Sequence, residues 1–302
     1  MSFFVEIDAV SKQYANHKAL DAVSFNIPQG AIFGLLGPNG AGKTSLIRIM
    51  NQITGADEGE IRINGERLKP EHIGLIGYLP EERGLYKKMK VLDQIVYFAQ
   101  LKDLSASEAK RRANDWLKKF DIEDWRNKKV EELSKGMQQK IQFIATVIHE
   151  PKLIILDEPF SGFDPINTEL IKQEIKNLRQ RGATVIFSTH RMESVEEICD
   201  HVGMINLSKK VLDGTVQEIK EQFKENKIAI EYSGEPKDNM PSPLTIEKMS
   251  NGDTKAIFAI TPEHRLMDLI NIMAPQVHIK SFRELVPSMH EIFIKKVKEG
   301  AL

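Results

Sequence analysis

A glycine-rich stretch near residue 40 has the residue types and spacing of a phosphate-binding loop. Gly37 and Gly42 stand five residues apart, and Lys43 and Thr44 follow directly, as in loops that hold the phosphates of a nucleotide. Glycines let successive backbone N–H groups turn inward around a phosphate, and the next helix directs its positive end at it. We therefore expect Lys43 to reach the β- and γ-phosphates and the Thr44 hydroxyl to bind Mg²⁺. The candidate phosphate-binding residues are Gly37, Pro38, Asn39, Gly40, Ala41, Gly42, Lys43, Thr44 and Ser45.

Two adjacent carboxylates could supply the metal ligand and the base that such a site needs. Asp157 and Glu158 directly follow the apolar run 153–156, so we expect them at the end of a buried strand. There Asp157 would hold the Mg²⁺ shell, and Glu158 would polarise an attacking water. A strand that merely ends in acidic residues gives the same pattern. The phosphate loop on the same chain favours the catalytic interpretation.

The segments around these motifs predict the elements that must position them. An apolar run at 31–36 precedes the loop, and a helical pattern at 44–50 follows it. The runs 153–156 and 184–187 are short, bounded and rich in β-branched residues, as strands buried in a parallel sheet usually are. A helical pattern at 169–179 separates them, and the order strand, helix, strand predicts a right-handed parallel crossover.

Composition narrows the class of protein. The chain has 302 residues, of which 41% are hydrophobic and 28% charged, which excludes a disordered or collagen-like chain. Its net charge of −1 provides no basic field for nucleic acid. The single cysteine, Cys199, excludes an intramolecular disulfide framework and a cysteine-rich zinc site, and suits a reducing cytoplasm. No signal-peptide pattern and no run of about 18 apolar residues occurs, so we expect an intracellular protein without a membrane span.

The sequence pattern divides the chain into two unequal domains. We expect a first domain at 1–225, with a helical subdomain at about 85–150, and a small α+β domain at 226–302. A loop rich in proline, glycine and polar residues at 233–243 lies within the second domain. Its expected strands are 227–232, 244–249, 255–260 and 277–282.

Two further sequences decide between classes of phosphate-loop protein. The loop lysine and the strand-end aspartate lie far apart, at 43 and 157, and no Asn-Lys-x-Asp guanine-reading tetrapeptide occurs, unlike in small GTPases. The run 133–138 reads Leu-Ser-Lys-Gly-Met-Gln, and a Thr-His pair ends the strand at 184–187. Together with the phosphate loop and in this order, these sequences resemble the ATP-binding cassette (ABC) family over about residues 3–225.

The resemblance implies roles for four more residues. Tyr14 stands where ABC proteins keep an aromatic ring that stacks on adenine, although a tyrosine at a strand edge is an alternative interpretation. Ser134 and Gly136 open a helix that, in the family, closes on the γ-phosphate of ATP held by the opposite subunit. His190 resembles the switch histidine that contacts the γ-phosphate.

Two sequences depart from the family pattern, at three positions. Lys135 and Met137 replace a glycine and a glutamine of the usual Leu-Ser-Gly-Gly-Gln, and Lys135 would add charge near the phosphate. Glu81 stands where a glutamine is expected; it can bind Mg²⁺ or water through oxygen, but it adds negative charge beside a triphosphate. The stretches 78–86 and 287–293 resemble ATPase subunits of sodium- or drug-exporting ABC systems.

The resemblance implies an α/β fold. It would be a P-loop NTPase cassette with a mixed sheet core, an antiparallel β subdomain and a helical subdomain, followed by the small α+β domain. Its cofactors would be ATP and Mg²⁺. Two copies, or one copy and a homologous subunit, would pair head to tail around ATP.

The implied function is that of the ATPase subunit of an exporter, peripheral on the cytoplasmic face of the membrane. It would drive a separate membrane-spanning permease docked near 81–90 and the helical insertion, with no nucleic-acid partner. The alternative is an ABC ATPase that acts on a ribosome or DNA. The C-terminal domain would extend the dimer interface or, in the alternative, sense a ligand.

Overall fold

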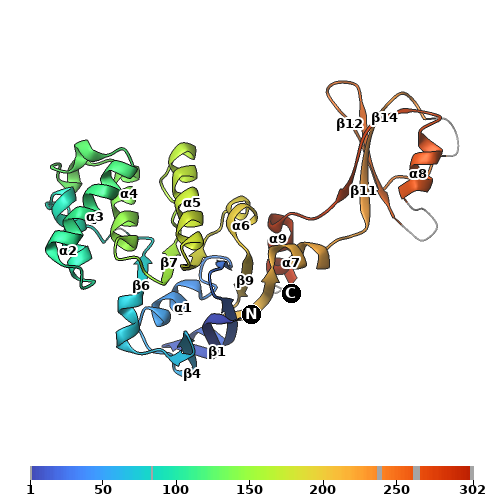
Figure 1. The fold of residues 1–302 in the computed structure, drawn as a ribbon. Coiled ribbons are helices and arrows are strands. Elements are labelled where there is room, and N and C mark those ends of the chain that lie inside the picture. Colours follow the sequence, from blue (N-terminus) through green and yellow to red (C-terminus); the bar gives the residue numbers. More distant parts are fainter. Residues whose placement is uncertain (1, 83, 237–239, 261–265, 300–302) are drawn as a thin grey trace. The chain divides into compact units, whose positions relative to one another are not determined.

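The structure is a computed structural model that describes residues 2–82, 84–236, 240–260 and 266–299 (Figure 1). These residues form two compact units, one of 2–216 with 295–299, and one of 217–294. The division at 216 lies earlier in the chain than the boundary at 225 expected from composition. Residues 295–299 belong to the first unit, where Nδ2 of Asn206 lies 3.5 Å from the carbonyl oxygens of Lys296 and Val297.

A six-stranded, mainly parallel sheet forms the centre of the first unit. Its neighbouring strands pair in parallel from β9 to β6, and β10 joins β9 antiparallel. All five residues of β3, β7 and β8 are buried, as expected for parallel strands covered on both faces. In spatial order the strands are β10 (Lys209–Thr215), β9 (His201–Asn206), β3 (Ile32–Leu36), β8 (Thr184–Ser188), β7 (Leu153–Asp157) and β6 (Ile76–Leu79).

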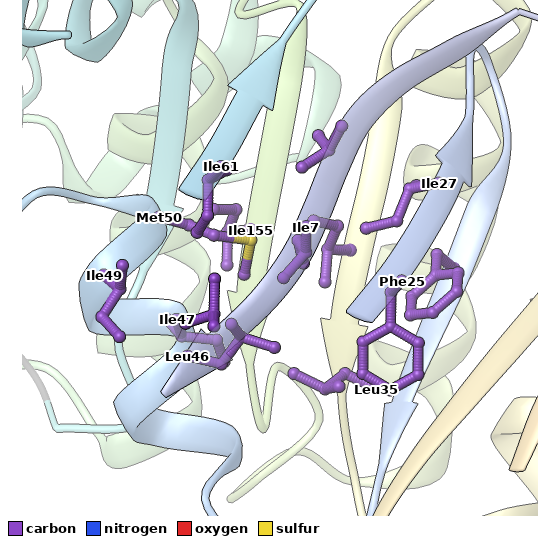
Figure 2. Packing of buried hydrophobic residues seen from close by; sticks show 14 of the residues in the cluster. Ile7, Phe25, Ile27, Leu35, Leu46, Ile47, Ile49, Met50, Ile61 and Ile155 are labelled. Carbon is purple, nitrogen blue, oxygen red and sulfur yellow. The ribbon is translucent and has the colours of Figure 1, made fainter. Parts of the chain in front are cut away.

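An antiparallel sheet packs against this centre through α1 (Lys43–Met50). Figure 2 shows Leu46, Ile47 and Met50 of α1 among side chains from both sheets. Each such aliphatic side chain contributes about 1.5–3 kcal/mol when fully buried, so this packing fixes the helix that follows the phosphate loop. The strands, in spatial order, are β2 (His17–Pro28), β1 (Phe3–Tyr14), β4 (Glu58–Ile63) and β5 (Glu66–Arg67).

Helices make up the rest of the first unit. Three of them form the helical subdomain that the sequence predicts between strands β6 and β7: α2 (Val91–Gln100), α3 (Ala106–Lys119) and α4 (Lys135–Val147). Short 3-10 turns lie at Pro70–Leu75, Glu123–Trp125 and Val130–Glu132. Helices α5 (Pro165–Gln180) and α6 (Met192–Ile198) connect the strands of the central sheet.

The second unit contains an antiparallel sheet and its own apolar core. Ile230 and Tyr232 pack with Phe258 and with Leu269 and Met273 of helix α8. The strands, in spatial order, are β12 (Thr245–Lys248), β13 (Thr254–Ala259), β11 (Lys227–Ser233) and β14 (His278–Leu285). The helices are α7 (Val216–Gln222), α8 (Leu266–Met273) and α9 (Met289–Glu299), with residues at the ends of α7 and α9 belonging to the first unit. Within the part of the chain that the structure describes, no helix is long and apolar enough to cross a bilayer.

Candidate nucleotide-binding site

The loop between β3 and α1 has a backbone that only glycine can adopt at two points. Gly37 and Gly42 have φ values of 150° and 117°, a region that other residues rarely enter. A Cβ at Gly37 would lie 2.2 Å from the carbonyl oxygen of Ile205, and one at Gly42 would lie 2.3 Å from that of Ala19. The two glycines therefore allow the loop to press against its neighbours and turn directly into the helix.

Lys43 is held inside this loop. Its Nζ donates to the carbonyl oxygens of Gly37, at 2.8 Å, and Pro38, at 3.1 Å. Burial lowers the pKa of Lys43, while the carboxylates of Glu158, Asp157 and Glu81 act to raise it. The N-cap of α1 is Gly42, which has no side chain to cap the first turn. A buried cation and an uncapped helix N-terminus together favour an anion at this point.

Asp157 lies at the C-terminal end of β7, opposite Ser188 of β8. It is buried, with 4% of its surface exposed, and accepts a hydrogen bond from Oγ of Ser188. Among the described residues, no group of three or more His, Cys, Asp or Glu side chains could hold a metal unaided. The donor set of Thr44, Asp157 and Glu81 fits Mg²⁺, which usually takes one or two carboxylates together with phosphate oxygens and water.

Glu158 and His190 form a pair at the ends of adjacent strands. Nδ1 of His190 lies 2.8 Å from Oε1 of Glu158, and Oγ1 of Thr189 donates to Oε2 at 3.4 Å. The Glu158 side chain is mostly buried, and its φ of 50° is left-handed. Its N–H donates to the carbonyl oxygen of Ser188 at 3.1 Å, which fixes the turn. Glu158 is thus a carboxylate held in one orientation, as a general base must be.

These groups surround one pocket of about 410 Å³. Most of the residues predicted from the sequence line it: Tyr14, Asn39, Gly40, Gly42, Lys43, Thr44, Ser45, Glu81, Asp157, Glu158 and His190. The other loop residues do not line the pocket. Gly37 and Pro38 supply the carbonyl acceptors of Lys43, and Ala41 is part of the apolar core. Tyr14 is 40% exposed, and Nζ of Lys12 lies 5.5 Å from the centre of its ring.

Ser134, Lys135 and Gly136, which the family resemblance assigns to ATP of the opposite subunit, do not line this pocket. Ser134 is the N-cap of α4, and its Oγ accepts a hydrogen bond from the N–H of Met137 at 3.3 Å. Lys135 is exposed. A Cβ on Gly136 would have the carbonyl oxygen of Gly162 as its nearest neighbour, at 3.4 Å. Their contact with ATP held by another subunit stays a prediction.

Two further residues that the sequence analysis left without a role, His17 and Ala19, also line the pocket. His17 pairs with Tyr14 across the β1–β2 turn. A two-residue hairpin turn places the residues that flank it opposite each other. The turn at Ala15 and Asn16 therefore predicts that His17 lies opposite Tyr14.

Comparison with known proteins identifies the family. The model of the family described as ABC transporter matches residues 20–161, and that of the DrrA1-3-like ATP-binding protein C-terminal domain matches residues 214–297. The ABC transporter ATP-binding protein YhaQ of Bacillus subtilis (strain 168) is 43% identical over 291 residues, covering 96% of this chain and 97% of that protein. The chain belongs to the ABC transporter ATP-binding proteins.

Other relatives agree with this assignment. The daunorubicin resistance ATP-binding protein DrrA3 of Streptomyces coeruleorubidus is 30% identical over 75% of this chain and 72% of its own length. A solved ATP-binding subunit of an ABC transporter superposes with a TM-score of 0.68 at 30% identity, covering 73% of this chain and 93% of that one. The predicted family, fold class and ATPase class are confirmed.

Proposed function

We propose that this chain is the ATP-hydrolysing subunit of an ABC exporter and drives a separate membrane-spanning permease from the cytoplasmic face of the membrane. One observation carries the catalytic part of the proposal. The fixed Glu158–His190 pair lines the same pocket as the buried Lys43 and the strand-end Asp157. A nucleotide's phosphates at the N-terminus of α1 would therefore meet a cation, a metal-binding carboxylate and a base at once.

The residues divide the work of hydrolysis among them. Nζ of Lys43 would exchange the carbonyl oxygens of Gly37 and Pro38 for phosphate oxygens, because a charged acceptor makes the stronger hydrogen bond. Glu158 would take a proton from the attacking water, with His190 holding its Oε1 in place. Mg²⁺, when bound by Thr44, Asp157 and Glu81, would neutralise charge on the phosphates.

A second subunit would complete the site. Ser134, Lys135 and Gly136 lie outside the pocket of their own chain, at an exposed helix N-terminus that suits an anion. We propose that they close on ATP held by the other subunit. In support, one solved cassette with a related fold is described as a dimer bound to ADP and phosphate, with a TM-score of 0.65 and 24% identity.

A second pocket, of about 310 Å³, supports a docking place for the permease. It lies beside the segment that follows β6 and is lined largely by apolar side chains, among them Leu85, Phe98 and Leu101. Gln142 also lines it; its Nε2 donates to the carbonyl oxygen of Pro80 at 3.2 Å, but its buried Oε1 has no partner among the described residues. An apolar segment with one hydrogen-bond donor would satisfy both features. Export, rather than import, is supported by the DrrA-like C-terminal match and by the drug-resistance relatives.

The test is Glu158→Gln, with Glu193→Gln on the exposed first turn of α6 as the matched control. Loss of a positioned base should lower the hydrolysis rate by about 10²–10⁴-fold and leave ATP binding intact, whereas the control should match the unchanged protein. If Glu158→Gln hydrolysed ATP at an undiminished rate, Glu158 would not be the general base.

The transporter assignment is tested separately, by purifying the tagged chain from its own cells. A membrane protein should copurify with the chain, and copurification of ribosomes or DNA instead would overturn the proposal.

A further inference from the structure

Two segments of the helical subdomain bring lysines together from distant parts of the sequence. The N–H of Val130 donates to the carbonyl oxygen of Met89 at 3.0 Å, and that of Val91 donates to Lys128 at 3.0 Å. Lys90 and Lys129 face each other as an antiparallel bridge. Five exposed lysines result, which we call the lysine surface: Lys87, Lys88, Lys90, Lys128 and Lys129.

Few carboxylates neutralise this surface. Lys129 lies 3.9 Å from Glu131, but no ion pair involves the other four lysines among the described residues. Over 86–93 and 126–132 there are six basic side chains and three carboxylates. One of these carboxylates, Glu132, already accepts a hydrogen bond from the N–H of Lys129. The surface therefore keeps a positive charge that another molecule can use.

Two exposed tyrosines adjoin the lysines. Tyr86 is 54% exposed and Tyr97 is 38% exposed, with ring centres 5.8 Å apart. Phe98 stacks on Tyr86 with ring centres 6.0 Å apart, so the rings form a fixed apolar edge. Tyrosine and apolar side chains beside lysines are the composition of surfaces that lie at a membrane–water interface.

The type of cation also indicates the partner. Lysine acts as a hydrated point charge on a long stem, whereas arginine favours bidentate pairing with one carboxylate or one phosphate. Among the described residues, Arg126 lies in the same segment, and its guanidinium donates to Oδ1 of Asn114. Exposed ammonium groups, of which only that of Lys129 has an ion pair among the described residues, suit a diffuse layer of anions better than a single acidic side chain.

We propose that the lysine surface and its tyrosine edge bind the anionic lipid headgroups of the membrane that carries the permease. The proposal rests on the proposed function, since the pocket assigned to the permease includes Leu101 and Leu85, beside this surface in the chain. In this arrangement the lysine stems would lie against the apolar edge while their ammonium groups reach the phosphates. Contact with lipid would orient the subunit before and during its engagement with the permease.

The test compares the full chain with K87Q/K88Q/K90Q in flotation with phosphatidylcholine vesicles, alone or mixed with phosphatidylglycerol. K110Q/K118Q/K248Q, which removes the same charge from exposed sites elsewhere, is the matched control. At about five-fold per lysine, the triple variant should lose on the order of 100-fold in affinity for the anionic vesicles. The control should bind like the unchanged chain, and added salt should weaken binding.

Three outcomes would overturn the proposal. They are equal binding to neutral and anionic vesicles, no loss in K87Q/K88Q/K90Q, and an equal loss in the control. If the triple variant binds vesicles normally but no longer copurifies the permease in detergent, the surface contacts an acidic protein segment instead. ATP hydrolysis in lipid-free solution reports on the nucleotide pocket alone, so its failure would count against the proposed function and not against lipid binding.

Discussion

Two helix N-termini in the first unit are predicted to face phosphate, and they are built in opposite ways. The N-cap of α1 is Gly42, which leaves the first turn uncapped, and a buried lysine and two strand-end carboxylates stand around it. The N-cap of α4 is Ser134, whose hydroxyl already accepts the N–H of Met137. The α1 terminus lies in a pocket lined by residues of the same chain, whereas the α4 terminus is exposed.

The difference shows how a helix N-terminus that is predicted to bind a phosphate can be stable in the absence of the phosphate. An uncapped, positively charged terminus costs stability unless an anion or a tightly held side chain is present. At α1 this loss of stability is offset by the apolar packing of the helix shown in Figure 2 and by the hydrogen bonds from Lys43 to the loop carbonyl oxygens. At α4 the serine cap satisfies the backbone until a partner's phosphate arrives.

The largest expected effect comes from adding one methyl group at the N-terminus of α1. Gly42→Ala must relieve a left-handed φ and a 2.3 Å contact with the carbonyl oxygen of Ala19. We expect the free energy of unfolding to fall by about 3 kcal/mol, and ATP affinity to fall on the order of 100-fold as the loop moves away from its phosphate contacts. Denaturant unfolding and titration with a fluorescent ATP analogue measure the two effects.

Gly136→Ala is the matched control for that variant. Its Cβ would make only ordinary contact, at 3.4 Å from Gly162, and alanine is the better helix former by about 0.8–1.0 kcal/mol. As an unpaired chain, the variant should bind ATP as the unpaired unchanged chain does, because Gly136 does not line the pocket. If both variants lost ATP affinity alike, the two termini would not differ in the way proposed.

The next effect concerns His190, the histidine of the α1 pocket that contacts Glu158. His190→Ala removes the contact with Oε1 of Glu158 and leaves the carboxylate free to turn. A base displaced by about 1 Å loses on the order of 100-fold in rate, so hydrolysis should fall while ATP affinity stays the same. Single-turnover hydrolysis and equilibrium ATP binding separate the two quantities. A loss confined to affinity would instead make His190 a binding residue.

Ser134→Ala should have a smaller effect, of a different kind. It removes the cap from α4 and should lower the free energy of unfolding by about 1 kcal/mol. ATP binding by the unpaired chain should not change, because Ser134 does not line the pocket. Hydrolysis at concentrations where the chain pairs should fall. A change in ATP affinity at low protein concentration would contradict the separation of the two sites.

Features formed by consecutive residues are easier to predict from the sequence than features formed by residues that are distant along the chain. The phosphate loop, Asp157 and Glu158 can be proposed from the sequence because the residue types that each role needs are consecutive and lie beside a buried strand. His17 was missed because its place depends on pairing across a hairpin, although a two-residue turn would have indicated it. The pairing of Glu158 with His190 depends on the ends of two adjacent strands and on a left-handed φ, which residue types do not reveal.

Features that join distant segments could not be predicted at all. The lysine surface requires residues near 88 and 128 to pair through their backbones, and no periodicity links the two. The division of the chain at 216 reflects how residues pack, which the sequence pattern alone does not specify. The serine cap of α4 is predictable from the sequence, because Ser134 stands before a helical pattern. The family resemblance instead indicates a role for Ser134 at a phosphate.

The smallest effect should also be the most discriminating, because stability and function should change in opposite directions. Lys135 lies in the first turn of α4, where a cation opposes the helix dipole. Lys135→Gln should therefore raise the free energy of unfolding by about 0.3–1 kcal/mol. If Lys135 serves a phosphate of the partner's ATP, the same variant should hydrolyse ATP more slowly when paired, with the loss greatest at low salt. Lys118→Gln, at the exposed end of α3, is the control for the charge change. If Lys135→Gln were more stable but the dimer still hydrolysed ATP at the unchanged rate, Lys135 would have no role at the partner's ATP.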